Sequence, residues 1–327
     1  MAVTIPDVAK RSGVAVGTVF RYLNGAKLRE ENRLKVEKAI EELGFKENVL
    51  AVAVIIEQLT DIFATSVITT VERTLEKQKY NIIISDFEKS AEKLEERLKF
   101  FKNRAISGLI LFSSGKGAHS IDILREYRAA NIPIVVVDDR IPGFETDVVL
   151  VDNAHASFRA VERLIHANHH KIAVLTGSQH SYVSQERLRG YAEAMKTYNI
   201  PAMDQWTQCG DFTTEGGYTA VKKLFQSASS APTAIYSTNY YMTLGAIIAL
   251  NELGVKIPEA LSFIGFDRFT ALDSMTPLLT VIEQPLDDLG RTAGKLMMKR
   301  IKGNFSDFPR TIKLKTKMCM RHSIRTI

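Results

Sequence analysis

The chain begins with MAVTIPDVAKRSGVAVGTVFRYLNG, residues 1–25, which has the pattern of two short helices joined by a glycine turn. Thr4 can cap the first helix with its hydroxyl, and Gly13 can end it because glycine tolerates the left-handed backbone found after a helix. In the second helix Val19 and Leu23 lie four residues apart, so they share a face that can pack against the first helix. This arrangement predicts a helix-turn-helix, a motif that enters the major groove of DNA.

The side chains that this packing turns outward would face DNA, and they include Val16, Gly17, Thr18 and Arg21. Residues 1–29 contain five lysine or arginine side chains against a single aspartate, an excess that could neutralise phosphates. A small helical bundle with a solvated basic face would show the same local pattern. The remainder of the chain therefore has to discriminate between the two interpretations.

A third helix is expected over EENRLKVEKAIEELGF, residues 30–45, because Val36 and Leu43 share its apolar face at helical spacing. The 327 residues of the chain leave room for two or three domains. We expect a helix-turn-helix domain over residues 1–51 and a larger domain over residues 52–327.

The composition is that of an ordinary globular protein, with 45% hydrophobic and 24% charged residues. The net charge of +6 permits nucleic-acid binding without demanding it. No apolar run is long enough to span a membrane and the N-terminus lacks the order of a secretory signal, so we expect a cytoplasmic protein without a membrane partner. The two cysteines, Cys209 and Cys319, are too few for a disulfide framework and lack metal-ligand spacing.

From residue 52 onward, short apolar runs alternate with longer amphipathic stretches. The runs are VAVII (52–56), NIIIS (81–85), GLILF (108–112), IPIVVV (132–137), VVLV (148–151), KIAVLTG (171–177), TQC (207–209), TAIYS (233–237) and LSFIGF (261–266). Such alternation is typical of a parallel sheet with crossover helices. We predict two doubly wound α/β lobes, in which the helix after KIAVLTG begins at Gln185.

Polar and aromatic side chains follow several of these runs directly. They are Asp138, Asp211, Phe212, Asn239 and Asp267. Because ligands of such sheets bind beyond the carboxyl ends of the strands, two facing lobes would gather these side chains around one cleft. Carboxylates and amides with one aromatic ring suit a sugar. A strand-end aspartate also commonly caps a turn, and for Asp138 both interpretations stay open.

The whole chain resembles the lactose repressor/galactose repressor (LacI/GalR) family. The motifs that carry the resemblance are VTIPDVAKRSGVAVGTVFRYLNG (3–25), SQERLRGY (184–191), GDFTTEGGY (210–218) and IPEALSFIGFD (257–267). The resemblance implies an all-α helix-turn-helix headpiece followed by a periplasmic-binding-protein-like (type I) sensor. It further implies a transcription regulator, most often a repressor, whose operator affinity is controlled by a small-molecule effector. The side-chain chemistry of the strand ends favours a sugar, and a purine stays open because Phe212 could stack on a base.

The resemblance also implies particular site residues. Base edges would be approached by Val16, Gly17 and Arg21, and phosphates would be held by Thr4, Thr18 and Asn24. The effector would be held by Arg187, Asn239 and Asp267 and covered by Phe212, with Asp138 and Leu286 completing the wall. The sensor would divide into an N-lobe of about 52–152 and 284–312 and a C-lobe of about 153–283 and 313–327.

The implied partners are a pseudo-palindromic operator, a carbohydrate effector and a second copy of the chain, as a homodimer or a tetramer. The dimer face would lie on the helix after Asp61 and on the segment after Gly290. Tyr240 and Arg268 stand where the family often has acidic residues, which leaves the effector open. A hinge helix usual in the family is absent between Ala51 and Val52, and we expect the native chain to carry extra residues there.

An alternative function is a sugar-binding sensor without sequence-specific DNA output, which a true lack of the hinge would favour. An enzyme is not expected, because the chain has neither a phosphate-binding P-loop nor a GxSxG nucleophile elbow. His166 and His169 are three residues apart, but no carboxylate or cysteine joins them. We therefore expect neither a metal nor a cofactor.

Overall fold

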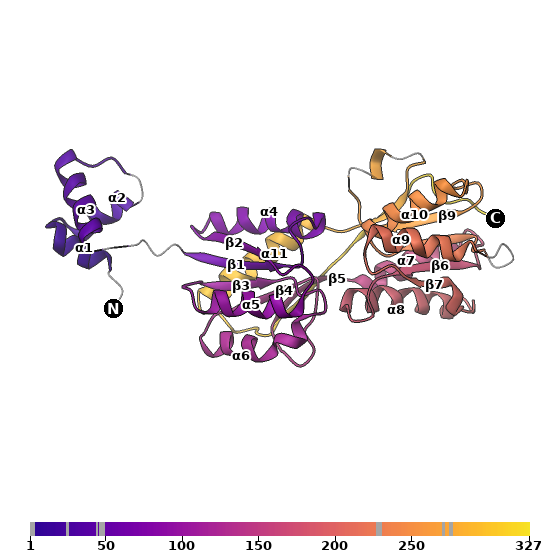
Figure 1. Ribbon diagram of the computed structural model, residues 1–327, viewed down its shortest axis with the longest axis horizontal. Coiled ribbons are helices and arrows are strands. Elements are labelled where there is room, and N and C mark those ends of the chain that lie inside the picture. The colour runs from indigo at the N-terminus through magenta and orange to yellow at the C-terminus, as the bar shows by residue number, and fades with distance from the viewer. Residues whose placement is uncertain are drawn as a thin grey trace. The chain divides into compact units, whose positions relative to one another are not determined.

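The computed structural model divides into two units, Met1–Leu50 and Ala51–Ile327 (Figure 1). It describes residues 4–23, 26–43, 45, 50–226, 231–269, 272–274 and 277–327. The division falls one residue before the predicted boundary, because Ala51 already pairs with Asn81 in a sheet. None of the described helices is long and apolar enough to cross a membrane.

The first unit, hereafter the headpiece, contains α1 (Ile5–Ser12), α2 (Val16–Leu23) and α3 (Glu30–Leu43). Gly13 ends α1 with a φ of 68°, as its position in the sequence predicted. At the start of α1 the Asp7 carboxylate accepts the Thr4 backbone N–H at 2.9 Å and the Thr4 hydroxyl at 2.5 Å. The Thr4 hydroxyl, predicted to cap α1, therefore donates to Asp7. The two residues together hold the start of α1 in place.

A small apolar core joins the three helices of the headpiece. Its buried members are Val8, Ala9, Val19, Val36 and Ala39. The predicted packing of Val19 against α1 is thus confirmed. The Tyr22 hydroxyl donates to Glu37 Oε1 at 3.0 Å and adds a polar contact between α2 and α3. Seven residues separate Leu43 at the end of α3 from Ala51, and most of them lie outside the described residues, so the expected extra hinge residues stay a prediction.

The second unit is a sensor of two lobes, each built on a six-stranded sheet. In the N-lobe the strand order is β2-β1-β3-β4-β5-β11, and all neighbours are parallel. The strands are β1 (Ala51–Ile56), β2 (Asn81–Asp86), β3 (Gly108–Leu111), β4 (Ile134–Val137), β5 (Asp147–Val151) and β11 (Thr311–Leu314). Its helices are α4 (Ile62–Glu76), α5 (Ala91–Lys102), η1 (Gly117–Ser120), α6 (Ile121–Ala129) and α11 (Leu286–Ile301).

The C-lobe repeats this topology with the order β7-β6-β8-β9-β10-β12, except that β12 runs antiparallel to β10. Its strands are β6 (Ile172–Thr176), β7 (Thr207–Cys209), β8 (Ala234–Ser237), β9 (Ser262–Phe266), β10 (Thr280–Glu283) and β12 (Lys317–Cys319). Its helices are α7 (Asn153–Ile165), α8 (Tyr182–Thr197), η2 (Asp204–Trp206), α9 (Thr214–Leu224), α10 (Tyr240–Glu252) and η4 (Leu272–Ser274).

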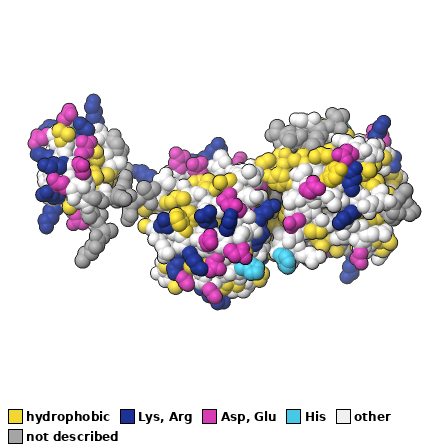
Figure 2. Space-filling view, viewed as in Figure 1, with side chains coloured by type: hydrophobic (Ala, Val, Ile, Leu, Met, Phe, Trp, Pro, Cys, Tyr) yellow, Lys and Arg dark blue, Asp and Glu magenta, His cyan; other side chains and the backbone are white. Residues whose placement is uncertain are grey.

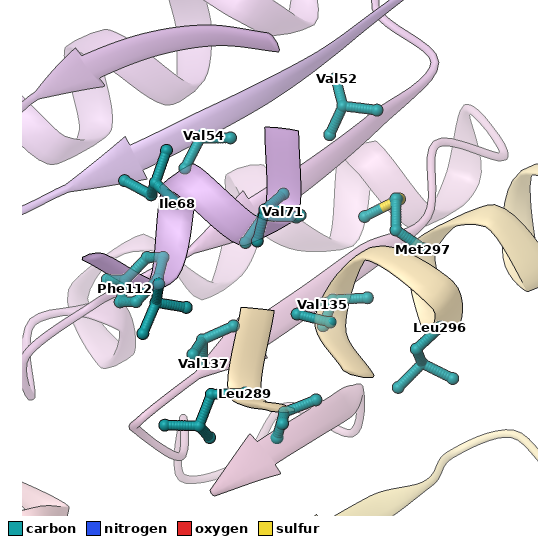
Figure 3. Packing of buried hydrophobic residues seen from close by; sticks show 14 of the residues in the cluster. Val52, Val54, Ile68, Val71, Phe112, Val135, Val137, Leu289, Leu296 and Met297 are labelled. Carbon is teal, nitrogen blue, oxygen red and sulfur yellow. The ribbon is translucent and has the colours of Figure 1, made fainter. Parts of the chain in front are cut away.

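Helices cover both faces of each sheet, and one apolar layer lies on each face. In the N-lobe α4 and α11 pack on one face and α5 and α6 on the other. Figure 3 shows the first layer, where Val71 of α4 and Met297 of α11 lie over the sheet that carries Val54 and Val135. In the C-lobe α9 and α10 share one layer and α7 and α8 the other. The buried apolar strands match the uninterrupted runs that predicted them.

The structure departs from the predicted elements at several points. The strands β10, β11 and β12 were not predicted, and β11 carries the N-lobe to residue 314 instead of 312. Helix α8 begins at Tyr182 rather than at Gln185. The reason is that Ser181 caps this helix by accepting the N–H of Ser184.

A buried ion pair anchors α11 in the N-lobe. Arg300 and Asp147 are both fully buried, and Arg300 Nε and Nη2 donate to the two Asp147 oxygens at 2.7 and 2.9 Å. Gly290 lets α11 approach α4 closely, because a Cβ at this position would lie 2.3 Å from the Val67 carbonyl oxygen. Helix α11 is therefore fixed to the first strand-helix unit of the same chain, although it lies more than two hundred residues later in the sequence.

Candidate functional site

The outward face of α2 carries the predicted DNA-contacting residues. Val16, Gly17 and Arg21 are exposed, and Thr18 is half-buried. Phe20, which is 55% exposed, lies one turn after Val16 and adds a second apolar side chain to this surface. Exposed apolar side chains of this kind can contact the methyl group of thymine. Thr4 is exposed before α1, and Asn24 lies outside the described residues.

The cations of the headpiece differ in how far they are free to meet phosphate. Arg11 pairs with Glu42 at 2.5 Å, and Arg33 pairs with both Glu30 and Glu37. The Arg21 carbonyl accepts the Ala26 N–H at 2.9 Å, but its guanidinium group makes no hydrogen bond or ion pair with the residues that the structure describes. Figure 2 shows lysine and arginine side chains mixed with acidic ones on the headpiece surface. Arg21 is therefore the cation on the outward face of α2, and no described acidic side chain pairs with it.

In the sensor a cavity of about 810 Å³ lies where the carboxyl ends of the two sheets meet. Five of the six predicted effector residues line it, namely Asp138 after β4, Arg187 on α8, Phe212 after β7, Asn239 before α10 and Asp267 after β9. Leu286 does not line it. As the first residue of α11, Leu286 packs instead against the apolar layer shared by α4 and α11.

Arg187 is held rigidly at the inner end of the cavity. Its side chain is buried, and Nε donates to Asn153 Oδ1 at 2.8 Å while Nη1 donates to the Thr238 carbonyl at 2.6 Å. The guanidinium lies 3.7 Å from the centroid of the Phe266 ring, a cation–π contact. These contacts leave Nη2 as the nitrogen available to a ligand.

Asp267 faces the same end of the cavity and is also buried. Its Oδ1 accepts Gln284 Nε2 at 2.5 Å and its Oδ2 accepts the Tyr240 backbone N–H at 3.3 Å. Burial raises the pKa of Asp267, while the nearby Arg187 charge and the hydrogen bond from Gln284 act against that rise. Asp267 is therefore both a ligand candidate and a support for the start of α10.

Asp138 has fewer partners than Asp267. Its Oδ1 atom is buried and accepts no hydrogen bond. Burial raises the pKa of Asp138 to about 8, because the lowering effect of Arg187 does not offset desolvation and the repulsion from Asp267 and Asp139. The turn-capping role belongs to its neighbour: Asp139 accepts the Gly115 N–H at 2.7 Å and also the Ser113 hydroxyl. Asp138 is left to face the cavity.

Two further predicted residues combine a structural contact with a place in the lining. Asn239 caps α10 by accepting the Met242 N–H at 2.9 Å, so its amide nitrogen stays available. Phe212 has a φ of 56°, and its ring lies so close to Gly177 that a Cβ there would approach it to 2.4 Å. A bare backbone at Gly177 thus allows the ring to lie against the cavity wall.

Sequence reasoning missed several residues of the lining. Asp61 caps α4 by accepting the Phe63 N–H at 3.0 Å, and burial raises the pKa of Asp61 to about 6. It lies in the loop between β1 and α4, so the strand-end rule would have found it only if extended from Glu57, which follows β1 directly, to the whole loop. Tyr240 packs edge-to-face on Phe269 with ring centroids 4.9 Å apart. No pattern in the sequence distinguished these rings from core aromatics.

The cavity is bordered by contacts between the two lobes. The Tyr241 hydroxyl on α10 donates to the Thr60 carbonyl at 3.0 Å and accepts the Ile62 N–H at 3.2 Å. At another edge, Gly115 of the N-lobe meets the backbone of His180 in the C-lobe, where a Cβ would lie 2.5 Å from the carbonyl oxygen. The lobes are therefore in contact around the cavity, in a closed arrangement.

The histidine pair singled out in the sequence has structural contacts. His169 is buried, with Nδ1 3.0 Å from the Thr233 hydroxyl and Nε2 3.0 Å from the Arg325 carbonyl. His166 Nε2 lies 3.0 Å from the Tyr198 hydroxyl. Within the described ranges, no group of three or more histidine, cysteine or acidic side chains is arranged to hold a metal ion.

Comparisons with known proteins agree with this architecture. Residues 4–48 match the family model for bacterial regulatory proteins of the lacI family, and residues 49–322 match the model for periplasmic binding proteins and the sugar binding domain of the LacI family. The two matches adjoin. Together they cover both the headpiece and the sensor.

Individual relatives align over almost the full chain. The transcriptional repressor PurR of Proteus mirabilis is 30% identical over 333 residues, which cover 98% of this chain and 96% of the relative. The ribose operon repressor of Haemophilus influenzae is 29% identical, with 99% of both chains covered. A solved complex of the transcriptional regulator CelR with cellobiose superposes with a TM-score of 0.76 at 26% identity, covering 98% of this chain and 99% of that one. The chain belongs to the LacI family of DNA-binding transcription regulators controlled by an effector.

Proposed function

We propose that the protein is a repressor that releases or binds a pseudo-palindromic operator when a carbohydrate occupies the cavity between its lobes. The observation that carries the proposal is the convergence of Asp138, Arg187, Asn239 and Asp267 on one cavity that also has aromatic walls. Hydroxyl groups bind to carboxylates, amides and guanidinium groups, and the apolar face of a sugar ring packs on an aromatic ring. The ribose operon repressor among the relatives and the solved complex of CelR with cellobiose support the same class of effector.

The protein acts as a homodimer in this proposal, because two headpieces match the two halves of a pseudo-palindrome. Apolar side chains are exposed where a second copy could cover them. Ile83 and Ile84 lie on β2, the edge strand of the N-lobe sheet, and Ile248 is 48% exposed on α10. Figure 2 shows hydrophobic side chains on this face of the C-lobe over α9 and α10. Sedimentation of wild type and of an Ile84→Glu variant would test this face, since loss of the dimer is expected in the variant.

Binding of genomic fragments tests the regulator function. Purified protein at near-physiological salt should retain fragments that share a pseudo-palindrome, and the neighbouring genes would nominate the sugar. Arg21→Ala should reduce selectivity for the operator by about tenfold or more, because a base-contacting arginine contributes about 1–3 kcal/mol of discrimination. Arg33→Ala is the matched control, since Arg33 is an exposed headpiece arginine already paired with Glu30 and Glu37.

A sugar sensor without DNA output is the competing function, and the seven-residue connection between α3 and β1 favours it. Retention of unselected DNA alone, lost on a modest rise in salt, would support that alternative. Operator selectivity that survives Arg21→Ala would remove this residue from base contact. The measured intact mass would show whether the chain carries more than its 36.6 kDa and hence extra hinge residues.

A further inference from the structure

The charges that line the cavity are unbalanced. Six carboxylates face three lysine or arginine side chains. The carboxylates belong to Glu57, Asp61, Glu92, Asp138, Asp211 and Asp267, and the cations to Lys89, Lys116 and Arg187. In a cleft with low-dielectric walls, such an excess repels an anion and attracts a cation, and it persists when Asp138 carries a proton.

The excess of negative charge is greatest at the inner end of the cavity, where Asp61, Asp138 and Asp267 lie near Arg187. Farther out, part of the charge is compensated within the lining. Lys116 Nζ lies 2.9 Å from Glu57 Oε1, so these two charges form an ion pair. At the inner end Asp61, Asp138 and Asp267 share Arg187, and no ion pair within 4.0 Å joins Arg187 to any of them in the described part of the chain. The guanidinium already donates to two protein oxygens, so it cannot satisfy three carboxylates.

Hydrogen bonding points to the same ligand chemistry as charge. Two of the buried polar atoms without a partner are acceptors that belong to lining residues, Asp138 Oδ1 and Gln284 Oε1. The Gln284 amide nitrogen donates to Asp267, so the amide cannot flip and its oxygen, an acceptor, keeps its position. A ligand that satisfies Gln284 Oε1 must therefore bring an O–H or N–H group, since a buried acceptor left unpaired is costly.

The outer rim does not provide a separate anion site. Ser90 caps α5 and accepts the Lys93 N–H at 3.1 Å, and its hydroxyl donates to Glu92 at 2.6 Å. The carboxylate of Glu92 in the first turn already supplies the negative charge that the helix end favours. A phosphate approaching this rim would meet that carboxylate.

We propose that the effector is a non-anionic, donor-rich sugar whose inner end carries hydroxyl groups or an amine, and that phosphorylated and carboxylated sugars are excluded. The inference rests on the sugar-effector function proposed above. An ammonium group supplies three donors and a positive charge, so an amino sugar matches the inner end better than its neutral parent does. A phosphate brings only acceptors at neutral pH and a charge of the wrong sign.

Titration calorimetry with matched charge series tests the proposal on the full chain. The probes are glucose, glucosamine and glucose 6-phosphate, ribose and ribose 5-phosphate, and cellobiose. In any series that binds, the phosphate ester should bind at least about tenfold more weakly than its parent, a difference of about 1.4 kcal/mol. Where an amine replaces a hydroxyl at the inner end, affinity should rise and the gain should fall with added salt.

Two variants identify the source of the discrimination. At pH 9, above the raised pKa of about 8, Asp138→Asn keeps the shape of the side chain and removes its charge, so it should narrow the ratio of the affinities for the neutral sugar and its phosphate by about threefold or more. Asp122→Asn is the control, because this aspartate is exposed on α6 outside the cavity. An anionic sugar that binds as tightly as its parent would overturn the charge inference. If no sugar in any charge state binds or alters operator affinity, the proposed sugar-effector function fails instead.

Discussion

Asp138 and Asp267 occupy equivalent positions in the two lobes, yet their surroundings differ. Each follows the fourth strand of its sheet, has a left-handed backbone with φ of 55° and 72°, and donates its N–H to the adjoining strand, at Val149 and Ile282. Asp267 accepts hydrogen bonds from Gln284 and Tyr240, whereas the buried Asp138 Oδ1 accepts none. The two carboxylates thus occupy equivalent positions, but only that of Asp267 forms hydrogen bonds that hold neighbouring elements together.

The difference also shows how the lobes divide the work of binding. The C-lobe holds Arg187, Asn239 and Asp267 through side-chain and backbone contacts within its own core. The N-lobe offers Asp61 and Asp138, whose cavity-facing oxygens depend on a ligand or a proton for compensation. We infer that the C-lobe carries a preformed part of the site and the N-lobe carries the part that responds to occupancy.

Removing Arg187 should have the largest effect, because its positive charge stabilises the ionised forms of both Asp138 and Asp267. Arg187→Ala should lower the free energy of unfolding by about 3 kcal/mol and abolish effector binding, since buried charges and acceptors lose their partner. Urea denaturation and calorimetry measure the two effects. Arg189→Ala is the control on the same helix: its exposed pairs with Glu186 and Glu193 contribute little, so a change within about 0.5 kcal/mol is expected.

Replacing each aspartate by asparagine tests directly whether Asp138 and Asp267 contribute differently to stability. Asparagine keeps the shape and tolerates a positive φ, so the backbone cost is similar at both sites. Asp267→Asn should reduce the free energy of unfolding by about 1.5 kcal/mol, because the new amide cannot accept from both Gln284 and Tyr240. Asp138→Asn should leave stability at neutral pH unchanged or raised. Equal losses for the two variants would contradict the assignment of unequal structural roles.

The dependence of stability on pH gives a finer test. Asp138 keeps a proton up to about pH 8 in the folded state, whereas the unfolded chain releases it near its ordinary pKa of about 4. The native state binds more protons in that window, so this group makes stability fall as pH rises from about 4 to 8 and leaves it level above. Asp138→Asn should therefore gain stability relative to wild type by up to about 1.4 kcal/mol for each pH unit between pH 5 and 8. Parallel stability curves would exclude the raised pKa.

The smallest expected effect concerns the contact between the lobes at Tyr241. Tyr241→Phe removes the hydroxyl that bridges Thr60 and Ile62, at a cost of up to about 1 kcal/mol in the closed arrangement. Small-angle scattering of the effector-free protein should show a larger radius of gyration, with a weakening of effector binding of up to about fivefold. Tyr218→Phe loses a comparable hydroxyl contact, to Glu252 within the C-lobe, and should leave both quantities unchanged.

The sequence predicted the parts of the fold that depend on continuous apolar runs. Buried parallel strands such as VAVII and SFIGF are unmistakable, whereas β11 (TIKL) and β12 (KMC) are short, polar and at sheet edges, so they carry little periodic signal. The topology of the lobes then followed from alternation alone. Helix α8 was misplaced at its start because the capping role of Ser181 depends on a local hydrogen bond rather than on periodicity.

The site was predictable where chemistry follows a strand end and unpredictable where tertiary packing decides. Asp138, Asn239 and Asp267 were found by the strand-end rule, and they do line the cavity. Leu286 was expected in the wall, but the register of α11 turns it into the apolar layer. The partners that distinguish Asp138 from Asp267 are Gln284 and Tyr240, and no local pattern in the sequence could connect them.

The chain passes between the lobes three times, after β5, after β10 and after β11, so neither lobe is a continuous segment. This has a consequence for synthesis. When the ribosome has reached residue 285, all the parallel strands of the C-lobe exist, but α11 does not, and Val67 and Val71 of α4 have no partner helix. A nascent chain therefore carries an uncovered apolar face, prone to aggregation, until α11 and β11 have emerged. Truncation of the chain before α11 and β11 would therefore leave the N-lobe incomplete, although most of this lobe is synthesised first.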